Sequence, residues 1–345
     1  MRARFRSLIA AAVVVAALPF AATAVAKPKA LPVEPVALAV QATPIASFDP
    51  GEPERKRFGR LEFRGGLELS ADSPAFGGWS ALRLDASGER ILAVSDAGVW
   101  LTGRLDTANG RLSGLGDVKI AAMRGSAGET LARIGRADVE SLAVDGTACY
   151  VGIERVHEIR RYDCSGAPFA ARGMPRPVPS ALKKMPRNSG LEALVAVPRD
   201  LAGTGSALAG SLIGITETGE TGEADSLGFI IRGARFATFR VKRSDDFSVT
   251  DAALAGNDLL VLERHYSLLR GVSMRVRRIP LAAIGPGAMV DGEVLMTAGR
   301  GRQIDNMEGL AVHTNAAGET ILTMISDDNF SFLQRTLILQ FALLD

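Results

Sequence analysis

The stretch that decides the fold runs from Asp305 to Phe330 and reads DNMEGLAVHTNAAGETILTMISDDNF. It contains an acidic tip, a short apolar run, a turn at Asn315–Gly318, a second apolar run and another acidic tip. Two short apolar runs joined by turn residues predict a β-hairpin. Both ends of this hairpin carry carboxylates.

The same pattern occurs four times earlier in the chain. Its copies are GWSALRLDASGERILAVSDAG from Gly78, DVESLAVDGTACYVGIER from Asp138, NSGLEALVAV with an insert and SLIGITETGE from Asn188, and VTDAALAGNDLLVLERH from Val249. The steps between successive copies are 61, 52, 59 and 57 residues, counted from Trp79, Glu140, Glu192, Asp251 and Glu308. This period, built from short strands, predicts β-propeller blades with generous loops.

Hairpin geometry indicates where the acidic residues lie. Paired residues of an antiparallel hairpin have a constant sum of residue numbers, and half of that sum falls in the turn. Pairing Glu140 with Glu154 puts the midpoint at Thr147, inside the DGTA turn. The other repeats behave in the same way. Each first strand should therefore start, and each second strand end, at one mouth of the central channel.

Ring closure follows from counting strands. Each blade needs four strands, and the last repeat supplies three, ending in Thr336–Leu343. The orphan strand Leu61–Leu69 completes that blade and closes the ring, because closure removes an exposed sheet edge. We therefore predict an all-β fold, a β-propeller of five four-stranded blades. The irregular stretch 164–187 leaves room for a sixth.

Two segments precede this domain. Residues 1–26 combine three arginines, an apolar run and the small-residue exit Ala24–Ala26, which is typical of a secretory signal peptide. A retained anchor is the alternative, because the apolar run reaches about the minimum length for a membrane span. Residues 27–56 carry six prolines and predict an extended tether, so that 57–345 form the propeller domain. We expect a periplasmic or secreted protein with no membrane span after cleavage.

Charge and cysteine content narrow the function further. Loss of the three arginines changes the formal net charge from +2 to −1, so nucleic acid is not an expected partner. The midpoint of Cys149 and Cys164 is 156.5, where the second hairpin of that blade should turn. Directly opposed cysteines in an oxidising compartment predict a disulfide. The alternative is two unrelated buried thiols.

Several segments resemble the "esterase-like activity of phytase" family of bacterial exported proteins. They are GRLEFRGGLELS, FGGWSALRLDASGERILAVSDAG, VPSALKKMPRNSGLEALV, LERHYSLLRGVSMRVRRI and DNMEGLAV…SDDNF, in the same order and spread from about Arg57 to Leu343. The resemblance implies an exported β-propeller that hydrolyses ester substrates. It supplies no agreed set of catalytic residues, so the mechanism has to come from this chain.

Nucleophilic catalysis by a Ser-His-Asp arrangement has little support. The chain has no G-x-S-x-G elbow and only three histidines, His157, His265 and His313. We expect His313 at the opposite mouth and His157 in a solvated turn. His265, directly after Glu263-Arg264, is the histidine placed beside the acidic mouth, and we keep it as a catalytic candidate.

Metal-assisted hydrolysis fits the carboxylates better. So many acids at one rim repel one another unless a cation or arginines neutralise them. Ligation by oxygen alone suits Ca²⁺ better than Zn²⁺. The predicted calcium ligands are Glu140, Glu192, Asp251, Glu308, Asp327 and Asp328. We also expect Glu140, Glu192 and Glu308 to take part in catalysis.

Basic residues near the same mouth are candidates for binding a small anionic ester. They are Arg155, Arg264, Lys183, Lys184 and Arg187. The two arginines can equally form structural ion pairs, and the basic loop can equally be a solvated surface. Two functional classes stay open. One is an exported hydrolase of phosphate or carboxylic esters, and the other is a non-catalytic propeller that binds a ligand or protein partner around structural calcium.

Overall fold

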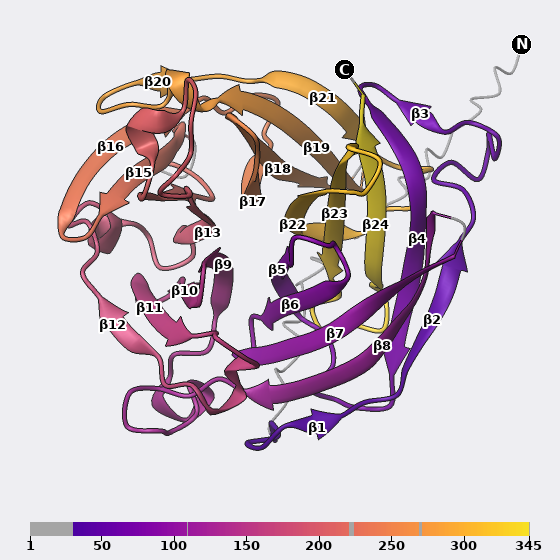
Figure 1. Cartoon of the computed structure of the whole chain (residues 1–345), viewed down its shortest axis with the longest axis horizontal. Helices are drawn as coiled ribbons and strands as arrows, with labels where there is room; N and C mark the ends of the chain where they lie inside the picture. Colours follow the sequence, from indigo (N-terminus) through magenta and orange to yellow (C-terminus); the bar gives the residue numbers. More distant parts are fainter. Residues whose placement is uncertain (1–29, 109, 221–223, 269–270, 345) are drawn as a thin grey trace, which may run out of the picture.

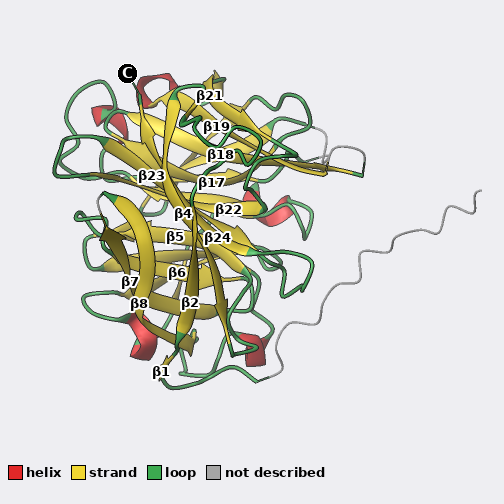
Figure 2. Ribbon diagram, turned by 90° about the vertical axis from the view of Figure 1, so that its right-hand side faces the viewer, coloured by secondary structure: helices red, strands yellow, loops and turns green. Residues whose placement is uncertain are grey.

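The computed structural model describes residues 30–108, 110–220, 224–268 and 271–344. The predicted signal peptide, residues 1–26, lies outside the described residues. Five antiparallel sheets surround a central channel (Figure 1). Loops collect on two opposite faces of the ring (Figure 2). The prediction of a five-bladed propeller is confirmed.

Each blade is one sheet whose strands run in order from the channel outward. Blade 1 contains β5 (Trp79–Leu84), β6 (Arg90–Ser95), β7 (Val99–Ala108) and β8 (Arg111–Ala122), and blade 2 contains β9 (Val139–Asp145), β10 (Ala148–Ile153), β11 (Glu158–Asp163) and β12 (Met174–Arg176). Blade 3 contains β13 (Leu191–Ala196), β14 (Leu212–Thr216), β15 (Ser226–Arg232) and β16 (Arg235–Val241), with the short strand β20 (Met289–Val290) parallel to its outer edge. Blade 4 contains β17 (Ser248–Ala255), β18 (Asp258–Ser267), β19 (Gly271–Pro280) and β21 (Glu293–Ala298).

Blade 5 joins the two ends of the described chain. Its inner strands are β22 (Asn306–Thr314), β23 (Thr320–Asp327) and β24 (Thr336–Leu343), and its outer strands are β4 (Leu61–Ala71) and β2 (Val40–Ile45), with β3 (Arg57–Phe58) beside β4. In the antiparallel pair of β4 and β24, Thr336 lies opposite Leu69 and Leu343 opposite Leu61. The expected pairing is therefore present, and Figure 1 shows the indigo strand β4 beside the yellow strand β24.

The stretch predicted as a tether packs along the propeller instead. The strand β1 (Val36–Ala37) pairs with β8, and β2 pairs with β4. Partly buried Leu31, Leu38 and Val40 contact the apolar core between blades 5 and 1. Prolines are compatible with edge strands, because an edge strand leaves half of its N–H groups unpaired. We correct the tether interpretation for residues 30–45.

The hydrophobic core lies between neighbouring blades. Five clusters of buried side chains each combine residues from two adjacent sheets. Short 3-10 helices cover the connections: η1 (Ala132–Ile134), η2 (Pro168–Ala170), η3 (Leu182–Lys184), η4 (Ser206–Leu208) and η5 (Leu281–Ala283). In the described part of the chain, no helix is long and apolar enough to cross a membrane.

The disulfide is present, but its hairpin register differs from the prediction. Cys149 and Cys164 are bonded, with their Cα atoms 5.8 Å apart. Cys149 lies opposite Tyr162, two residues from the predicted partner position. The shift arises because the four-residue turn from Glu154 to His157 sets the centre of the hairpin one position earlier. The bond therefore joins Cys149 to the residue just beyond the end of β11.

Candidate functional site

A β-bulge interrupts the inner hairpin of every blade near one mouth of the channel. The bulged residues, which have no partner across the hairpin, are Ser80, Glu140, Glu192, Thr250 and Glu308. A bulge bends the strand and changes the direction of the side chain. Three of the five bulged residues are glutamates, and each offers a carboxylate oxygen within 4.8 Å of the others. The predicted convergence of Glu140, Glu192 and Glu308 is therefore observed.

The bulges also correct the prediction for Asp251. Thr250, not Asp251, occupies the position of the three glutamates. Asp251 is fully buried and pairs with Arg83, with Nη1–Oδ2 and Nη2–Oδ1 distances of 2.8 and 3.0 Å. Its oxygens also accept the backbone N–H groups of Leu310 and Ala252. Since both oxygens are already satisfied, we no longer count Asp251 among the ligands.

Further carboxylates extend the group of three. Asp138 precedes β9, Glu154 follows β10, and Glu217 follows β14. Asp138 and Glu154 group with Glu140, and Glu154 and Glu217 group with Glu192, again with oxygens within 4.8 Å. We call these six residues the acidic cluster: Asp138, Glu140, Glu154, Glu192, Glu217 and Glu308.

The backbone holds this cluster in a specific conformation. Asp138 has a φ of 94°, a strained value for a residue with a side chain. Its N–H donates to the Asp96 carbonyl at 2.6 Å, and its own carbonyl accepts the N–H of Glu154 at 2.9 Å. The N–H of Gly190 donates to Glu154 Oε1 at 3.1 Å. A Cβ on Gly190 would lie 2.6 Å from Glu154 Cγ, so this close approach requires glycine.

Two predicted arginines lie against the cluster. Arg264 Nη1 donates to Asn306 Oδ1 at 2.7 Å and lies 3.5 Å from Glu308 Oε1, and its Nη2 lies 3.7 Å from Glu217 Oε1. Arg155 Nε lies 3.0 Å from Asp138 Oδ2, with about half of the arginine side chain exposed. Blade 4 thus contributes a guanidinium where three other blades contribute carboxylates. These arginines are outnumbered by the six acids of the cluster.

Burial and mutual repulsion raise the pKa of the clustered acids. For Glu140, burial has the largest effect, followed by the negative charges of Asp96 and Glu308. Together they raise the pKa of Glu140 well above its usual range. For Glu192, burial and then Glu140 and Glu154 have the same effect. Burial also raises the pKa of Glu154 to about 7. Protons or cations are therefore needed to neutralise the site near neutral pH.

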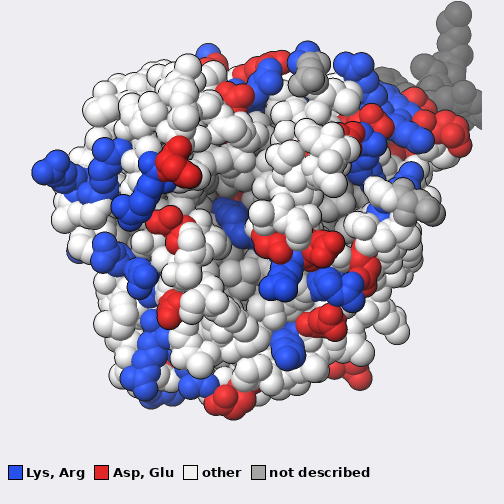
Figure 3. All heavy atoms as spheres, in the orientation of Figure 1, with Lys and Arg blue, Asp and Glu red and all other residues white. Residues whose placement is uncertain are grey.

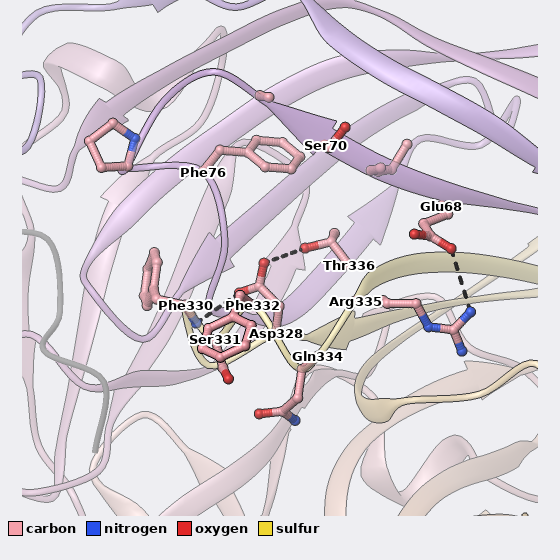
Figure 4. Close-up of a pocket in the computed structure, with 13 residues that line it drawn as sticks. Glu68, Ser70, Phe76, Asp328, Phe330, Ser331, Phe332, Gln334, Arg335 and Thr336 are labelled. Carbon is pink, nitrogen blue, oxygen red and sulfur yellow. Dashed lines mark hydrogen bonds and ion pairs between the residues drawn. The ribbon is translucent and has the colours of Figure 1, made fainter. Parts of the chain in front are cut away.

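Asp327 and Asp328 have different surroundings. Asp327 is buried, and its pKa is raised by that burial and then by Glu308 and Asp96, so it borders the cluster. Asp328 instead organises a loop. Its Oδ1 accepts the N–H groups of Gly78 and Phe330, and its Oδ2 accepts the Thr336 hydroxyl at 2.8 Å (Figure 4). The structure thus gives Asp328 a role other than the predicted one.

The histidines do not complete a catalytic set. His265 Nδ1 lies 3.2 Å from the Asp246 carbonyl oxygen, and its ring packs on Phe247, so its contacts are with the β16–β17 loop and not with the cluster. His157 is buried, and its Nε2 lies 3.0 Å from the Met185 carbonyl oxygen, so its predicted solvation is wrong. His313 packs against the β5–β6 turn at Gly88.

The predicted basic loop is a surface feature. Lys183 and Lys184 lie in η3 and Arg187 in the turn after it, and all three are exposed. They precede β13, so they stand on the same face as the cluster. Sequence reasoning did not rank Asp138, Glu154 and Glu217 as site residues. The available signal was that Glu154 and Glu217 end second strands of their hairpins, where the repeat also places Asp327.

Comparison with protein families gives a match over most of the chain. The model of a phytase-like family, described as "Esterase-like activity of phytase", matches residues 74–330. A search of curated proteins finds no match. Similar solved structures include glutaminyl cyclase of Myxococcus xanthus, with 13% identity, 78% of this chain and 92% of that chain covered, and a TM-score of 0.41. The Pan2 WD40 domain of Neurospora crassa has 9% identity, coverages of 84% and 98%, and a TM-score of 0.41. Likeness at this level adds nothing about function.

Proposed function

Since the chain belongs to the phytase-like family described as having the esterase-like activity of phytase, we propose that it hydrolyses phosphate or carboxylic esters at the acidic cluster. The observation that carries this proposal is the convergence of Glu140, Glu192 and Glu308 from three bulged strands, beside Arg264. Such a concentration of like charges is costly for stability and therefore points to a function.

The donor set fits a calcium ion. Carboxylate oxygens on opposite sides of Ca²⁺ lie about 5 Å apart, because each Ca–O distance is about 2.3–2.6 Å. In the group of Glu140, Glu192 and Glu308, one oxygen from each residue lies within 4.8 Å of the others, and no thiol or imidazole joins the groups found among the described residues. Glu140, Glu192 and Glu308 would hold the ion, with Asp138, Glu154 and Glu217 beside them.

Different side chains have different roles in the proposed reaction. When bound, calcium would polarise a phosphoryl or carbonyl oxygen of the ester. In the metal-free site, burial raises the pKa of Glu154 to about 7, so this carboxyl exchanges protons near neutral pH. It can take a proton from the attacking water or give one to the leaving oxygen. Arg264 supplies N–H donors for the charge that develops on the ester oxygen.

Lys183, Lys184 and Arg187 attract an anionic substrate towards this face. Their exposure makes them a source of long-range attraction and not of tight contacts. Replacing all three with Gln should lower kcat/KM for a phosphomonoester at low salt. The difference from wild type should shrink at high ionic strength, because salt screens exposed charges.

Export is part of the proposal. The Cys149–Cys164 disulfide suits an oxidising compartment. The basic and apolar residues 1–26 suit a cleaved signal. N-terminal sequencing of the protein recovered from the periplasm or medium should give a chain that begins after Ala26. A chain retained in the cytoplasm with Met1 intact would contradict export.

A calcium-dependent melting experiment tests the metal site. Calcium should raise the melting temperature, because a ligand bound only by the folded state stabilises that state. Glu308→Gln and Glu140→Gln should abolish the increase and lower hydrolysis of a phosphomonoester and carboxyl-ester panel. Glu89→Gln, an exposed change in the β5–β6 turn, is the matched control.

The outcomes separate the two functional classes. A calcium-induced shift without turnover of any ester in the panel would favour a binding propeller with structural calcium. An unchanged melting curve, with activity that survives Glu308→Gln and chelator, would reject the metal mechanism.

A further inference from the structure

A pocket of about 460 Å³ lies on the face of the ring that carries the acidic cluster. Figure 4 shows the residues that line it. One wall is the end of β4 at Leu69–Ala71 together with Phe76, and the other is the β23–β24 loop, residues 328–335. The end of β4 and the β23–β24 loop both lie on the face of the ring where the innermost strand of each blade begins. The volume is in the range of pockets that bind small molecules.

Three phenylalanines contribute to the lining. Phe76 is buried, Phe330 is partly buried, and the side chain of Phe332 is 95% exposed. The loop that carries the last two is fixed by the Asp328 hydrogen bonds described above. Aromatic surface on an ordered loop beside a pocket is typical of a binding site, because burying it against a ligand is favourable.

The charged groups around the pocket are already paired. Arg335 Nη1 lies 2.9 Å from Gln303 Oε1 and 3.5 Å from Glu68 Oε2, and its Nε lies 3.7 Å from Asp305 Oδ2. Asp328 uses both oxygens as acceptors, for the Gly78 N–H and for the Thr336 hydroxyl. The neutral polar residues of the lining are Ser70, Ser331, Gln334 and Thr336. A group bound here therefore meets aromatic faces and neutral hydrogen-bonding groups, which favour an uncharged ligand with an aromatic part.

The pocket adjoins the acidic cluster at Gly78. A Cβ on Gly78 would lie 2.3 Å from Asp96 Oδ1 and 2.5 Å from Phe330 Cε2. Asp96 contributes to the raised pKa of Glu140, Glu308 and Asp327, so it lies within their field. Asp327 and Asp328, adjacent in sequence, border the cluster and the pocket respectively. Phe330 of the pocket and Asp96 beside the cluster therefore pack against the same glycine.

We propose that this pocket binds the uncharged aryl group of an ester whose ester linkage is presented to the acidic cluster. The inference rests on the proposed function and adds a substrate class to it. Esters with a one- or two-ring aromatic group are preferred over methyl esters and over polyphosphorylated polyols. Phe330 and Phe332 contact the rings, and the ester linkage extends past Gly78 towards Asp96 and the cluster.

A binding measurement tests the pocket without any turnover. Isothermal titration of the full chain with 2-naphthol should detect binding to wild type. The binding should be lost in Ser70→Trp, in which an indole replaces a small exposed side chain of the lining. Phe332→Ala should weaken it about two- to tenfold, the range expected for one aromatic pair. Phe236→Ala, an exposed Phe on β16, is the matched control and should bind as wild type does.

Turnover measurements connect the pocket to the ester. The ratio of kcat/KM for 2-naphthyl phosphate to that for methyl phosphate should fall in Ser70→Trp and in Phe332→Ala, and the same holds for the two acetates. Wild-type affinity for 2-naphthol in both variants would overturn the proposal, as would an unchanged ratio in an active enzyme. A polyphosphorylated polyol hydrolysed faster than 2-naphthyl phosphate would also overturn it. Pocket-dependent binding of 2-naphthol without turnover of any ester would instead reject the proposed hydrolase and retain an aryl-binding site.

Discussion

Arg83 spans the channel below the acidic cluster and ties four blades together. It extends from β5 of blade 1, and its guanidinium donates to the carbonyl oxygens of Leu194, Ala252 and Leu310 as well as to both oxygens of Asp251. Figure 3 shows basic side-chain atoms deep in the central hollow of the face it displays. Removing one partner of such a pair leaves a buried charge without compensation.

Arg83→Met should therefore destabilise the protein strongly. We expect a loss of about 3–5 kcal/mol in the free energy of unfolding, measured in urea, because Asp251 stays buried without its cation. Adding Asp251→Asn to this variant should recover part of the loss. Arg64→Met is the control, since Arg64 and its partner Glu319 are both partly exposed and such pairs contribute less than about 1 kcal/mol. Equal losses in the two single variants would contradict a special role for Arg83.

The cluster should make the metal-free protein less stable as the pH rises. Burial raises the pKa of Glu154 from 4.5 to about 7, and burial and neighbouring acids raise those of Glu140 and Glu192. A carboxyl group with a raised folded-state pKa favours folding while it is protonated. Its contribution is complete below about pH 4.5 and is lost as the pH rises through the folded-state pKa.

In chelator, the melting temperature should consequently fall between about pH 5 and pH 8. Calcium should remove the fall, because it binds the deprotonated carboxylates. Glu154→Gln should reduce the slope, whereas the Glu89→Gln control should keep it. A melting temperature that rises or stays level over this range in chelator would show that the cluster is not held at raised pKa.

At the scale of single residues, sequence predicted the glutamates better than the aspartates. Glu140, Glu192 and Glu308 share a position because each is a bulged residue. Asp251 was aligned with them by its charge, although the bulge of its hairpin falls on Thr250. Register of this kind depends on pairing across the hairpin and cannot be read from one strand. Glu154 was not predicted as a site residue, because its raised pKa depends on neighbours from other blades.

At the scale of elements, the alternation of apolar runs and turns located the inner strands closely. The predicted midpoints of the inner hairpins lie within one or two residues of the observed turns, because turn residues such as Asp145–Gly146 indicate where each turn falls. The strands β1 and β2 were missed, since a proline-rich sequence carries no clear period of two. They pair because the outer edges of β8 and β4 offer free backbone groups.

The disulfide of blade 2 should stabilise the protein through its unfolded state. It closes a loop of 15 residues, for which chain entropy contributes about 3 kcal/mol. Cys149→Ala with Cys164→Ala should lower the free energy of unfolding by about this amount in non-reducing buffer. Reductant should bring the wild type close to the double variant. Two free thiols found by mass analysis of non-reduced peptides from the exported protein would contradict the bond.

At the scale of the molecule, the ring of inner strands is continuous. β5 contacts β9, and so on around the channel until β22 contacts β5 again. The five-bladed count was predictable because each repeat carries its own hairpin. The pairing of β4 with β24 could be predicted, because the last repeat lacked its fourth strand and one strand near the start of the chain had no blade. The face-wide arrangement of pocket and cluster was not predictable, since it depends on how blades 1, 2, 3 and 5 sit around the channel.

If β4 closes the ring, deleting Arg57–Ser70 should abolish stable folding. The change removes the partner of β24 over its whole length and exposes the edge of blade 5. It also removes Leu61, Phe63 and Leu67, all buried in the cores on the two sides of that blade. We expect loss of a cooperative thermal transition, measured by circular dichroism. Deleting residues 30–39, which carry β1 alone, is the control and should leave the transition cooperative.

The backbone N–H of Leu344 donates to the carbonyl of Arg60, so the end of β24 lies beside the start of β4. A chain in which residues 57–70 are moved behind Leu344 through a short linker should therefore fold again. A cooperative transition at the wild-type temperature after the deletion would show that closure does not depend on this strand.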